Sequence, residues 1–409
     1  MSNFVIENGV LFFGFSDDNG NADIPEGVTA ICGGAFNNCR DLKNVTIPGS
    51  VTDIGETAFL NCTALTSVTI PDGVTKIGEH AFEGCTSLAE VTIPDSVTEI
   101  GAFAFEGTPW LENKRLQDPL VIINGRIIDG RGCMGDVTIP DGVTEIPAEA
   151  FWGCEGITGV TIPDSVTGIG FDAFKYCTIL KRVDIPDNGI KICPGAFAET
   201  SWLENKRRED PFVIVNGTLI DGKACVGGVT VPDSANAVGT SAFSYNESLT
   251  SVTIPDSVTE LGEIAFNYCT GLTSVKLPAG LSKIPQGLFG VCQSLTDVTI
   301  PDGVTEIGKY AFLGCSALTA PALPAGLTKL SKGMFGLCES LSEVTIPERV
   351  TVIETDAFLG CNSLKELAVP DTVTVIERGA FANCSSITVT YKGSAYTQNN
   401  MEELYAQFS

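Results

Sequence analysis

A strict 23-residue period constrains this 409-residue chain more than any other feature of its sequence. An Ile-Pro dipeptide, or a close variant, marks the period, and successive prolines are 23 or 46 residues apart without slippage. A phenylalanine lies eleven residues after each proline, so the chain is an array of fourteen repeats. The prolines are Pro25, Pro48, Pro71, Pro94, Pro140, Pro163, Pro186, Pro232, Pro255, Pro278, Pro301, Pro324, Pro347 and Pro370, and the phenylalanines are Phe36, Phe59, Phe82, Phe105, Phe151, Phe174, Phe197, Phe243, Phe266, Phe289, Phe312, Phe335, Phe358 and Phe381.

One repeat, Leu65–Ser87, shows the pattern that the others share. Val68 and Ile70 alternate with polar residues, which predicts a short strand. Pro71 ends that strand because it has no N–H to donate to a ladder. Phe82 and Cys85 are spaced like one face of a short helical turn.

A single repeat of this kind cannot bury its apolar residues alone, so neighbouring repeats must stack and bury them as continuous columns. The strands would then lie about 4.7–4.9 Å apart in one parallel sheet. A wider turn opposite each strand would bend the stack, with the sheet on the concave face. The predicted fold class is therefore an α/β repeat solenoid with short helical or irregular convex segments.

The order L-x-x-V-x-I-P-x-x-V-x-x-I-G-x-x-A-F-x-x-C-x-x-L resembles the BspA-like class of leucine-rich repeats, from about Phe4 to Tyr391. That class is known mostly from bacterial surface-associated proteins and from parasitic protists. The resemblance implies a leucine-rich-repeat solenoid that acts as an adhesin or binding protein. Secreted members carry leaders, whereas the N-terminal MSNFVIENGVLFFGF is not a signal peptide as written. We therefore expect either a protein inside the cell or a surface protein whose leader has been removed.

Two 46-residue intervals interrupt the array with similar segments, 108–139 and 200–231. Each opens with a helix-start signal and continues to an Asn-Gly pair, which favours a tight hairpin. The N-terminus carries a similar hairpin without the helix, which we interpret as a cap. We predict that both interruptions protrude or flare from one continuous solenoid. The predicted modules are 1–107, 108–199 and 200–391, with a C-terminal cap at 392–409.

The charge balance excludes some partners. The chain has 24 Lys and Arg against 50 Asp and Glu, a net charge of −26. Such a surface repels the phosphates of nucleic acids and of anionic membranes. No segment approaches the roughly 20 apolar residues of a membrane-spanning helix. The sequence thus favours a protein or glycan partner and a monomeric chain that is not inserted in a membrane.

Eleven of the 15 cysteines share one repeat position. They could serve metal or redox chemistry, or they could form an inward column of small apolar thiols. Converging ligands such as Cys-x-x-Cys are absent from the sequence, so we expect reduced, metal-free packing residues and no cofactor. The eleven are Cys39, Cys62, Cys85, Cys154, Cys177, Cys269, Cys292, Cys315, Cys338, Cys361 and Cys384, while Cys32, Cys133, Cys193 and Cys225 lie off this column.

No catalytic constellation is evident in the sequence. His80, the only histidine, falls at a variable outward position and pairs with no Ser or Cys through a motif. Aspartates recur after the repeat prolines, as at Asp72 and Asp95. They could form a ligand ladder for calcium or carbohydrate, but turn chemistry explains them equally well. We therefore predict no catalytic residues and no enzyme activity.

Two sets of residues are the candidate binding surface. A threonine stripe is expected to line the outward face of the strands, where it could bind an extended ligand or reflect ordinary β-propensity. Lys114-Arg115 and Lys206-Arg207-Arg208 form basic clusters in an acidic chain; they could be counter-ions for the acidic turns of adjacent coils or a docking point for an anionic partner, but we expect them to be solvated helix faces. The threonines are Thr46, Thr69, Thr92, Thr138, Thr161, Thr230, Thr253, Thr299 and Thr345.

Three function classes stay open at this point. The first is a non-catalytic solenoid that binds protein or glycan, as a bacterial surface-associated adhesion or interaction protein. The second is an intracellular protein-interaction scaffold, which the free thiols and the missing leader favour. The third is a carbohydrate-active solenoid enzyme, which would need one unique pair of carboxylates.

Overall fold

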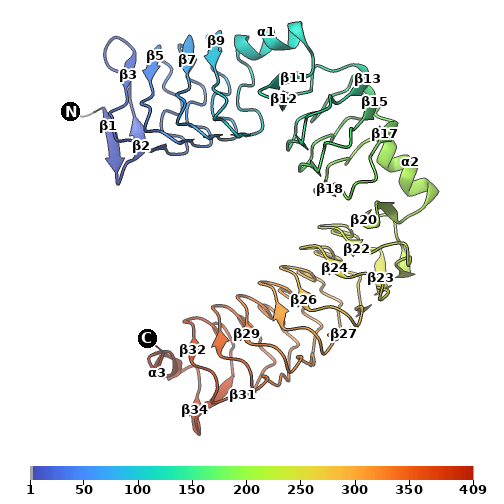
Figure 1. The fold of residues 1–409 in the computed structure, drawn as a ribbon. Coiled ribbons are helices and arrows are strands. Elements are labelled where there is room, and N and C mark those ends of the chain that lie inside the picture. The colour runs from blue at the N-terminus through green and yellow to red at the C-terminus, as the bar shows by residue number, and fades with distance from the viewer. Residues whose placement is uncertain (1–2, 409) are drawn as a thin grey trace. The chain divides into compact units, whose positions relative to one another are not determined.

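A computed structural model describes residues 3–408 as a β-solenoid of stacked coils with few helices (Figure 1). The chain divides into two compact units, one ending at Asn205 and the other beginning at Lys206. Each coil has one 23-residue repeat, and equivalent residues of adjacent coils pair directly. The predicted fold class is confirmed, including the parallel pairing of the strands and the interrupting hairpins.

The predicted strand of each repeat forms a parallel ladder along one face of the coils. Residue pairs such as Val68↔Val91 and Val252↔Val275 keep the side chains in register. The ladder has no assigned strand between Thr299 and Glu366, where Pro321 replaces a strand residue. The strands are β3 Asn21–Asp23, β5 Asn44–Thr46, β7 Ser67–Thr69, β9 Glu90–Thr92, β13 Gly135–Thr138, β15 Ile157–Thr161, β17 Arg182–Asp184, β21 Gly227–Thr230, β23 Leu249–Thr253, β25 Ser274–Lys276, β27 Asp297–Thr299, β31 Glu366–Val369 and β33 Thr388–Tyr391. The last strand, β34 Ser394–Tyr396, pairs antiparallel with β33.

A second parallel ladder, which the sequence did not predict, follows each turn after the proline. Two residues per coil form it, and one of the two is a buried aliphatic residue such as Ile77 or Ile307. Its strands are β4 Ala30–Ile31, β6 Asp53–Ile54, β8 Lys76–Ile77, β10 Glu99–Ile100, β14 Glu145–Ile146, β16 Gly168–Ile169, β18 Lys191–Ile192, β22 Ala237–Val238, β24 Glu260–Leu261, β26 Lys283–Ile284, β28 Glu306–Ile307, β29 Lys329–Leu330, β30 Val352–Ile353 and β32 Val375–Ile376.

The repeat phenylalanines are buried and form three stacks. Neighbouring rings lie nearly parallel, as for Phe59 and Phe82 with centroids 5.0 Å apart and Phe151 and Phe174 at 4.6 Å. The first stack runs from Phe36 to Phe105, the second from Phe151 to Phe197 and the third from Phe243 to Phe381. A buried ring contributes roughly 3–5 kcal/mol to stability over alanine, so these columns dominate the core.

The two interruptions, named junction 1 (108–139) and junction 2 (200–231), contain helices α1 Pro109–Gln117 and α2 Ser201–Glu209. Each helix closes a phenylalanine stack with a tryptophan: Trp110 lies against Phe105 and Trp202 against Phe197, both with centroids 4.7 Å apart. The hydroxyl of Thr108 accepts a hydrogen bond from the N–H of Leu111, which caps α1. The predicted helices are confirmed.

A β-hairpin precedes the first phenylalanine of each stack. These hairpins are β1 Phe4–Glu7 with β2 Val10–Gly14, β11 Val121–Ile123 with β12 Arg126–Asp129, and β19 Val213–Val215 with β20 Thr218–Asp221. Strands β2 and β20 pair in parallel with β4 and β22, so they are the first rungs of the second ladder. The prediction that the internal hairpins protrude is therefore wrong for junction 2, where the hairpin edge pairs with the next coil. At the C-terminus, α3 Met401–Tyr405 covers the last coil, and the Tyr405 hydroxyl accepts from the N–H of Phe381.

The Ala-Phe segment of each coil is a turn, not the predicted helical turn. Its N–H groups bond to the next coil, as from Phe36 to the carbonyl of Ala58 at 2.7 Å. The residues two before and two after the phenylalanine adopt positive φ, for example His80 and Phe103 at 55°. A side chain at either position points away from the phenylalanine stack and is half-buried or exposed at the surface.

Candidate binding surface

The threonine stripe lies on the first ladder, as predicted, but in separate sheets. Thr69 pairs with Thr92, and Thr138 pairs with Thr161. Thr253 and Thr299 both pair with Lys276, which lies between them. Thr46 donates a hydrogen bond to Asp23 at 2.7 Å. Most of these threonines are exposed, while Thr161 and Thr253 are half-buried.

The basic cluster of α2 divides into two kinds of residue. Lys206 and Arg208 are exposed, and Lys206 pairs with Glu209 at 3.1 Å. The side chain of Arg207 is only 21% exposed and forms a two-pronged contact with Asp221, both N–O distances being 2.9 Å. The expectation that all three are solvated is wrong for Arg207, because it holds the helix to the hairpin.

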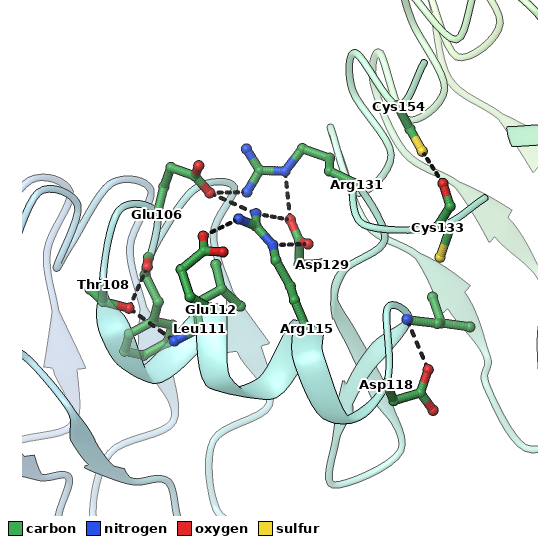
Figure 2. Close-up of polar contacts among 12 residues, drawn as sticks. Glu106, Thr108, Leu111, Glu112, Arg115, Asp118, Asp129, Arg131, Cys133 and Cys154 are labelled. Carbon is green, nitrogen blue, oxygen red and sulfur yellow. Dashed lines mark hydrogen bonds and ion pairs between the residues drawn. The ribbon is translucent and has the colours of Figure 1, made fainter. Parts of the chain in front are cut away.

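At junction 1 the corresponding aspartate, Asp129, is part of a larger network of ion pairs (Figure 2). Asp129, whose side chain is 1% exposed, accepts from Arg115 at 2.9 and 3.0 Å and from Arg131 at 2.5 Å. Both arginines also contact Glu106 of the preceding coil, and Arg115 contacts Glu112. Burial lowers the pKa of Arg115, but the hydrogen bond and charge of Asp129 outweigh it and raise that pKa overall. The network links the last coil of the first stack, α1 and the hairpin.

Beside this network lies a run of surface rings that we call the junction-1 patch: His80, Phe103, Trp152 and Tyr176. His80 stacks on Phe103 with centroids 5.3 Å apart. Trp152 lies edge-on to both Phe103 and Tyr176, at 6.0 and 5.6 Å. Trp152 is 39% exposed and Tyr176 44% exposed. The ring planes therefore remain partly open to solvent across the junction.

Backbone strain accompanies two of these rings. Phe103 has φ +55° and Tyr176 has φ +62°, in the left-handed region that bulky residues avoid. These positions have positive φ throughout the array, with glycine in some coils, as at Gly195 and Gly153, and a bulky side chain in others, as at Ile264 and Tyr268. The strain is therefore a property of the repeat and does not distinguish the patch. Sequence reasoning missed the patch because its four rings come from four coils and from three different repeat positions.

Carboxylates surround the patch. Burial raises the pKa of Glu149, and the nearby negative charges of Asp172 and Glu79 raise it further, against the smaller opposing effects of His80 and Lys175. His80 Nδ1 also lies 2.5 Å from a carboxylate oxygen of Glu83. These carboxylates repel one another at short range. The patch therefore holds more negative charge than its own cations offset.

A groove of about 720 Å³ adjoins the patch on the second ladder of the first unit. It lies between strands β8 and β10, the turn of hairpin β11–β12 and strand β14. The Arg126 guanidinium donates to the carbonyl of Thr98 at 2.9 Å and so fixes the hairpin against the ladder. Glu79, which precedes the patch residue His80, lines the groove, as does Ala148, which precedes Glu149. The groove therefore reaches the backbone next to the patch.

The cysteine column lies in the core, where the thiols donate weak hydrogen bonds to the preceding coil. Cys62 donates to the carbonyl of Phe36 at 3.2 Å, and Cys269 to that of Phe243 at 3.1 Å. Burial raises the pKa of Cys177 and Cys338 to about 12, which keeps them neutral and unreactive. Because burial favours the neutral thiol, the contribution of these cysteines to the free energy of unfolding is complete below pH 9. It is lost as the pH rises toward 12.

The described residues contain neither a candidate metal site nor a membrane-spanning helix. Within residues 3–408, no group of three or more His, Cys, Asp or Glu side chains could hold a metal ion. Asp256 accepts from the N–H of Ala279 in the next coil, so this aspartate links two coils. None of the helices in this described range is long and apolar enough to span a membrane.

Comparison with known proteins places the repeat in a described family. Residues 12–133, 130–210, 223–340 and 264–388 match the sequence model of the BspA type Leucine rich repeat region. No curated protein matches the chain.

Several solved structures are also similar. A leucine rich cell surface protein from Faecalibacterium prausnitzii is 29% identical, over 83% of this chain and 92% of its own, with a TM-score of 0.41. A leucine-rich repeat protein from Bacteroides ovatus is 26% identical, over 96% and 98%, with a TM-score of 0.39. The leucine rich repeat protein of T. pallidum is 33% identical, over 45% of this chain and 77% of its own, with a TM-score of 0.27.

Proposed function

The chain belongs to the BspA-type leucine-rich repeat family, and from that premise we propose that it is a non-catalytic binding protein at a cell surface, with a protein or a glycan as its partner. The resemblance to surface-associated adhesins supports this location and role. The partner would contact the outward side chains, because the inward ones pack the core.

The observation that carries this proposal is the junction-1 patch beside its groove. Single exposed rings are common on protein surfaces, whereas a contiguous aromatic cluster is typical of an interaction site. Here four rings lie in contact with one another beside a groove, which supports a role in binding. The exposed threonine stripe, Lys206 and Arg208 are secondary candidate contacts.

Binding is tested by presenting the purified chain to arrays of extracellular-matrix proteins and of glycans. The variant Phe103→Gly with Trp152→Ser gives junction 1 the residues that junction 2 carries at Gly195 and Ser244. We expect a partner of the wild-type chain to bind this variant at least about tenfold more weakly, which corresponds to about 1.4 kcal/mol.

Tyr245→Ala is the matched control, since Tyr245 has the repeat position of Tyr176 and is 68% exposed. It should retain the same partner. Array partners that bind all three proteins equally would move the binding surface elsewhere. An array on which nothing is retained, or on which a glycan is cleaved, would contradict a non-catalytic binding role.

A further inference from the structure

We propose that the junction-1 patch recognises a basic polypeptide segment, whose Arg and Lys side chains stack on its rings while the surrounding carboxylates offset their charge. This inference rests on the proposed function, because it names the partner chemistry of the same surface. Two observations carry it: the ring geometry and the local excess of negative charge.

The rings of the patch already accept cations. The Arg131 guanidinium lies over the Phe103 ring, 4.6 Å from its centroid, and Lys175 Nζ lies 5.5 Å from the centroid of Tyr176. Both distances are within the roughly 6 Å range of a cation–π contact. Trp152 lies between these two rings, is partly exposed and provides the strongest cation–π face of the natural side chains.

Negative charge surrounds the rings in excess. Glu79, Glu83, Glu149 and Asp172 lie at or beside the patch. Lys175 pairs with Asp172 at 2.7 Å, and Arg131 is held by Asp129 and Glu106, so neither offsets Glu149 fully. A bound guanidinium or ammonium group would relieve the repulsion among these carboxylates. The net charge of −26 would also attract a basic partner at long range.

The charge decides between a basic segment and a neutral glycan. Aromatic rings alone would suit either ligand. A neutral sugar would leave the carboxylates repelling one another, and it would gain nothing from the long-range field. A basic segment uses the rings, the carboxylates and the field together, so the observations favour it.

Fluorescence-anisotropy titration with labelled nona-arginine tests the inference on the full chain. The uncharged analogue nona-citrulline keeps the length and shape of the probe without its charge. We expect wild-type chain to bind nona-arginine and not nona-citrulline. Trp152→Ser should weaken the binding about fivefold to tenfold, the size of one or two lost cation–π contacts. Glu149→Gln should weaken it about threefold.

Matched variants separate this site from general attraction to an acidic protein. Tyr245→Ala removes an exposed ring and Glu263→Gln an exposed carboxylate, both outside the patch. Each should stay within about twofold of wild type. Equal weakening by the patch and control variants, or no effect of any, would overturn the inference. Retention of cellohexaose by the patch in place of nona-arginine would also overturn it, while leaving the proposed binding function intact.

Discussion

Junctions 1 and 2 have the same architecture but different side chains around it. In both, a tryptophan closes one phenylalanine stack, and a threonine at the helix start donates to the last phenylalanine carbonyl at 2.7 Å. In both, a glycine opens the next stack, because a Cβ at Gly130 or Gly222 would overlap the following ring. Each junction thus combines a terminal cap with an initial cap.

Four of the differences between the junctions concern the ion network and the patch rings. Junction 1 uses Glu106 and Arg131 in its ion network, where the equivalent residues near junction 2 are Ala198 and Lys223. The patch rings Phe103 and Trp152 correspond to Gly195 and Ser244. Junction 2 therefore has the packing that the fold requires, and the additions at junction 1 are not required for capping. The network and the patch are therefore features of junction 1 that the shared scaffold does not require.

The two junctions also differ in how their arginines contact the preceding coil. Glu106 gives the arginines of junction 1 an acceptor on the preceding coil, and Ala198 has no carboxylate that could serve the same purpose. We infer that the ion network stiffens junction 1 beneath the patch.

The largest expected change in the free energy of unfolding comes from replacing the buried aspartates Asp129 and Asp221. Asp129→Ala leaves two arginines, whose side chains are each 16% exposed, without their shared acceptor, and we expect it to lower the free energy of unfolding by about 3–5 kcal/mol. Asp221→Ala should cost about 2 kcal/mol, because Asp221 is the acceptor of one such arginine, Arg207, and not of two. Urea denaturation measures both.

Asp136→Ala is the control, since the Asp136–Arg182 pair is exposed and should contribute at most about 1 kcal/mol. If the two buried aspartates gave equal losses, the arginines of junction 1 would add nothing to its stability, and the inferred stiffening would be wrong.

A smaller effect is expected when junction 1 receives the ionic residues of junction 2. Glu106→Ala with Arg131→Lys should speed amide exchange in α1 about tenfold, equivalent to about 1.4 kcal/mol, by removing the link to the preceding coil. Hydrogen-exchange mass spectrometry of residues 109–117 reports this change, and residues 201–209 serve as the internal reference. Unchanged exchange in α1 would mean that its capping contacts alone hold it.

The sequence predicted what depends on repetition. The 23-residue period locates the phenylalanine stacks, the first ladder and both junction helices, because each element recurs or carries a strong local signal such as Asn124-Gly125. It missed the second ladder, because two residues such as Lys76–Ile77 are too few to show an alternating pattern.

The junction-1 patch was missed for a different reason. Phe103 and Trp152 lie in different coils on the two sides of an interruption, and no periodic signal connects them. Their proximity depends on how the helix and hairpin replace one coil. Arg207 was misjudged similarly, because its partner Asp221 is part of the hairpin and not of the helix surface. Contacts made by interruptions are therefore the part of this fold that periodicity cannot predict.

The smallest expected effect concerns the exposed basic residues of α2. Lys206→Glu with Arg208→Glu should change the free energy of unfolding by no more than about 0.5 kcal/mol, because both side chains are exposed and the Lys206–Glu209 pair contributes only tenths of a kcal/mol. The fold does not require a cation at the second position, since its equivalent in α1 is Leu116, which is 84% exposed. Arg207→Glu in the same helix should instead destabilise the chain strongly, by placing a carboxylate against Asp221. Urea denaturation of the three proteins compares these effects, and unfolding of the Lys206 and Arg208 variant would show that the whole cluster is structural. If that variant folds but loses its array partner, the basic cluster of junction 2 is a contact surface, and the assignment of binding to junction 1 alone is wrong.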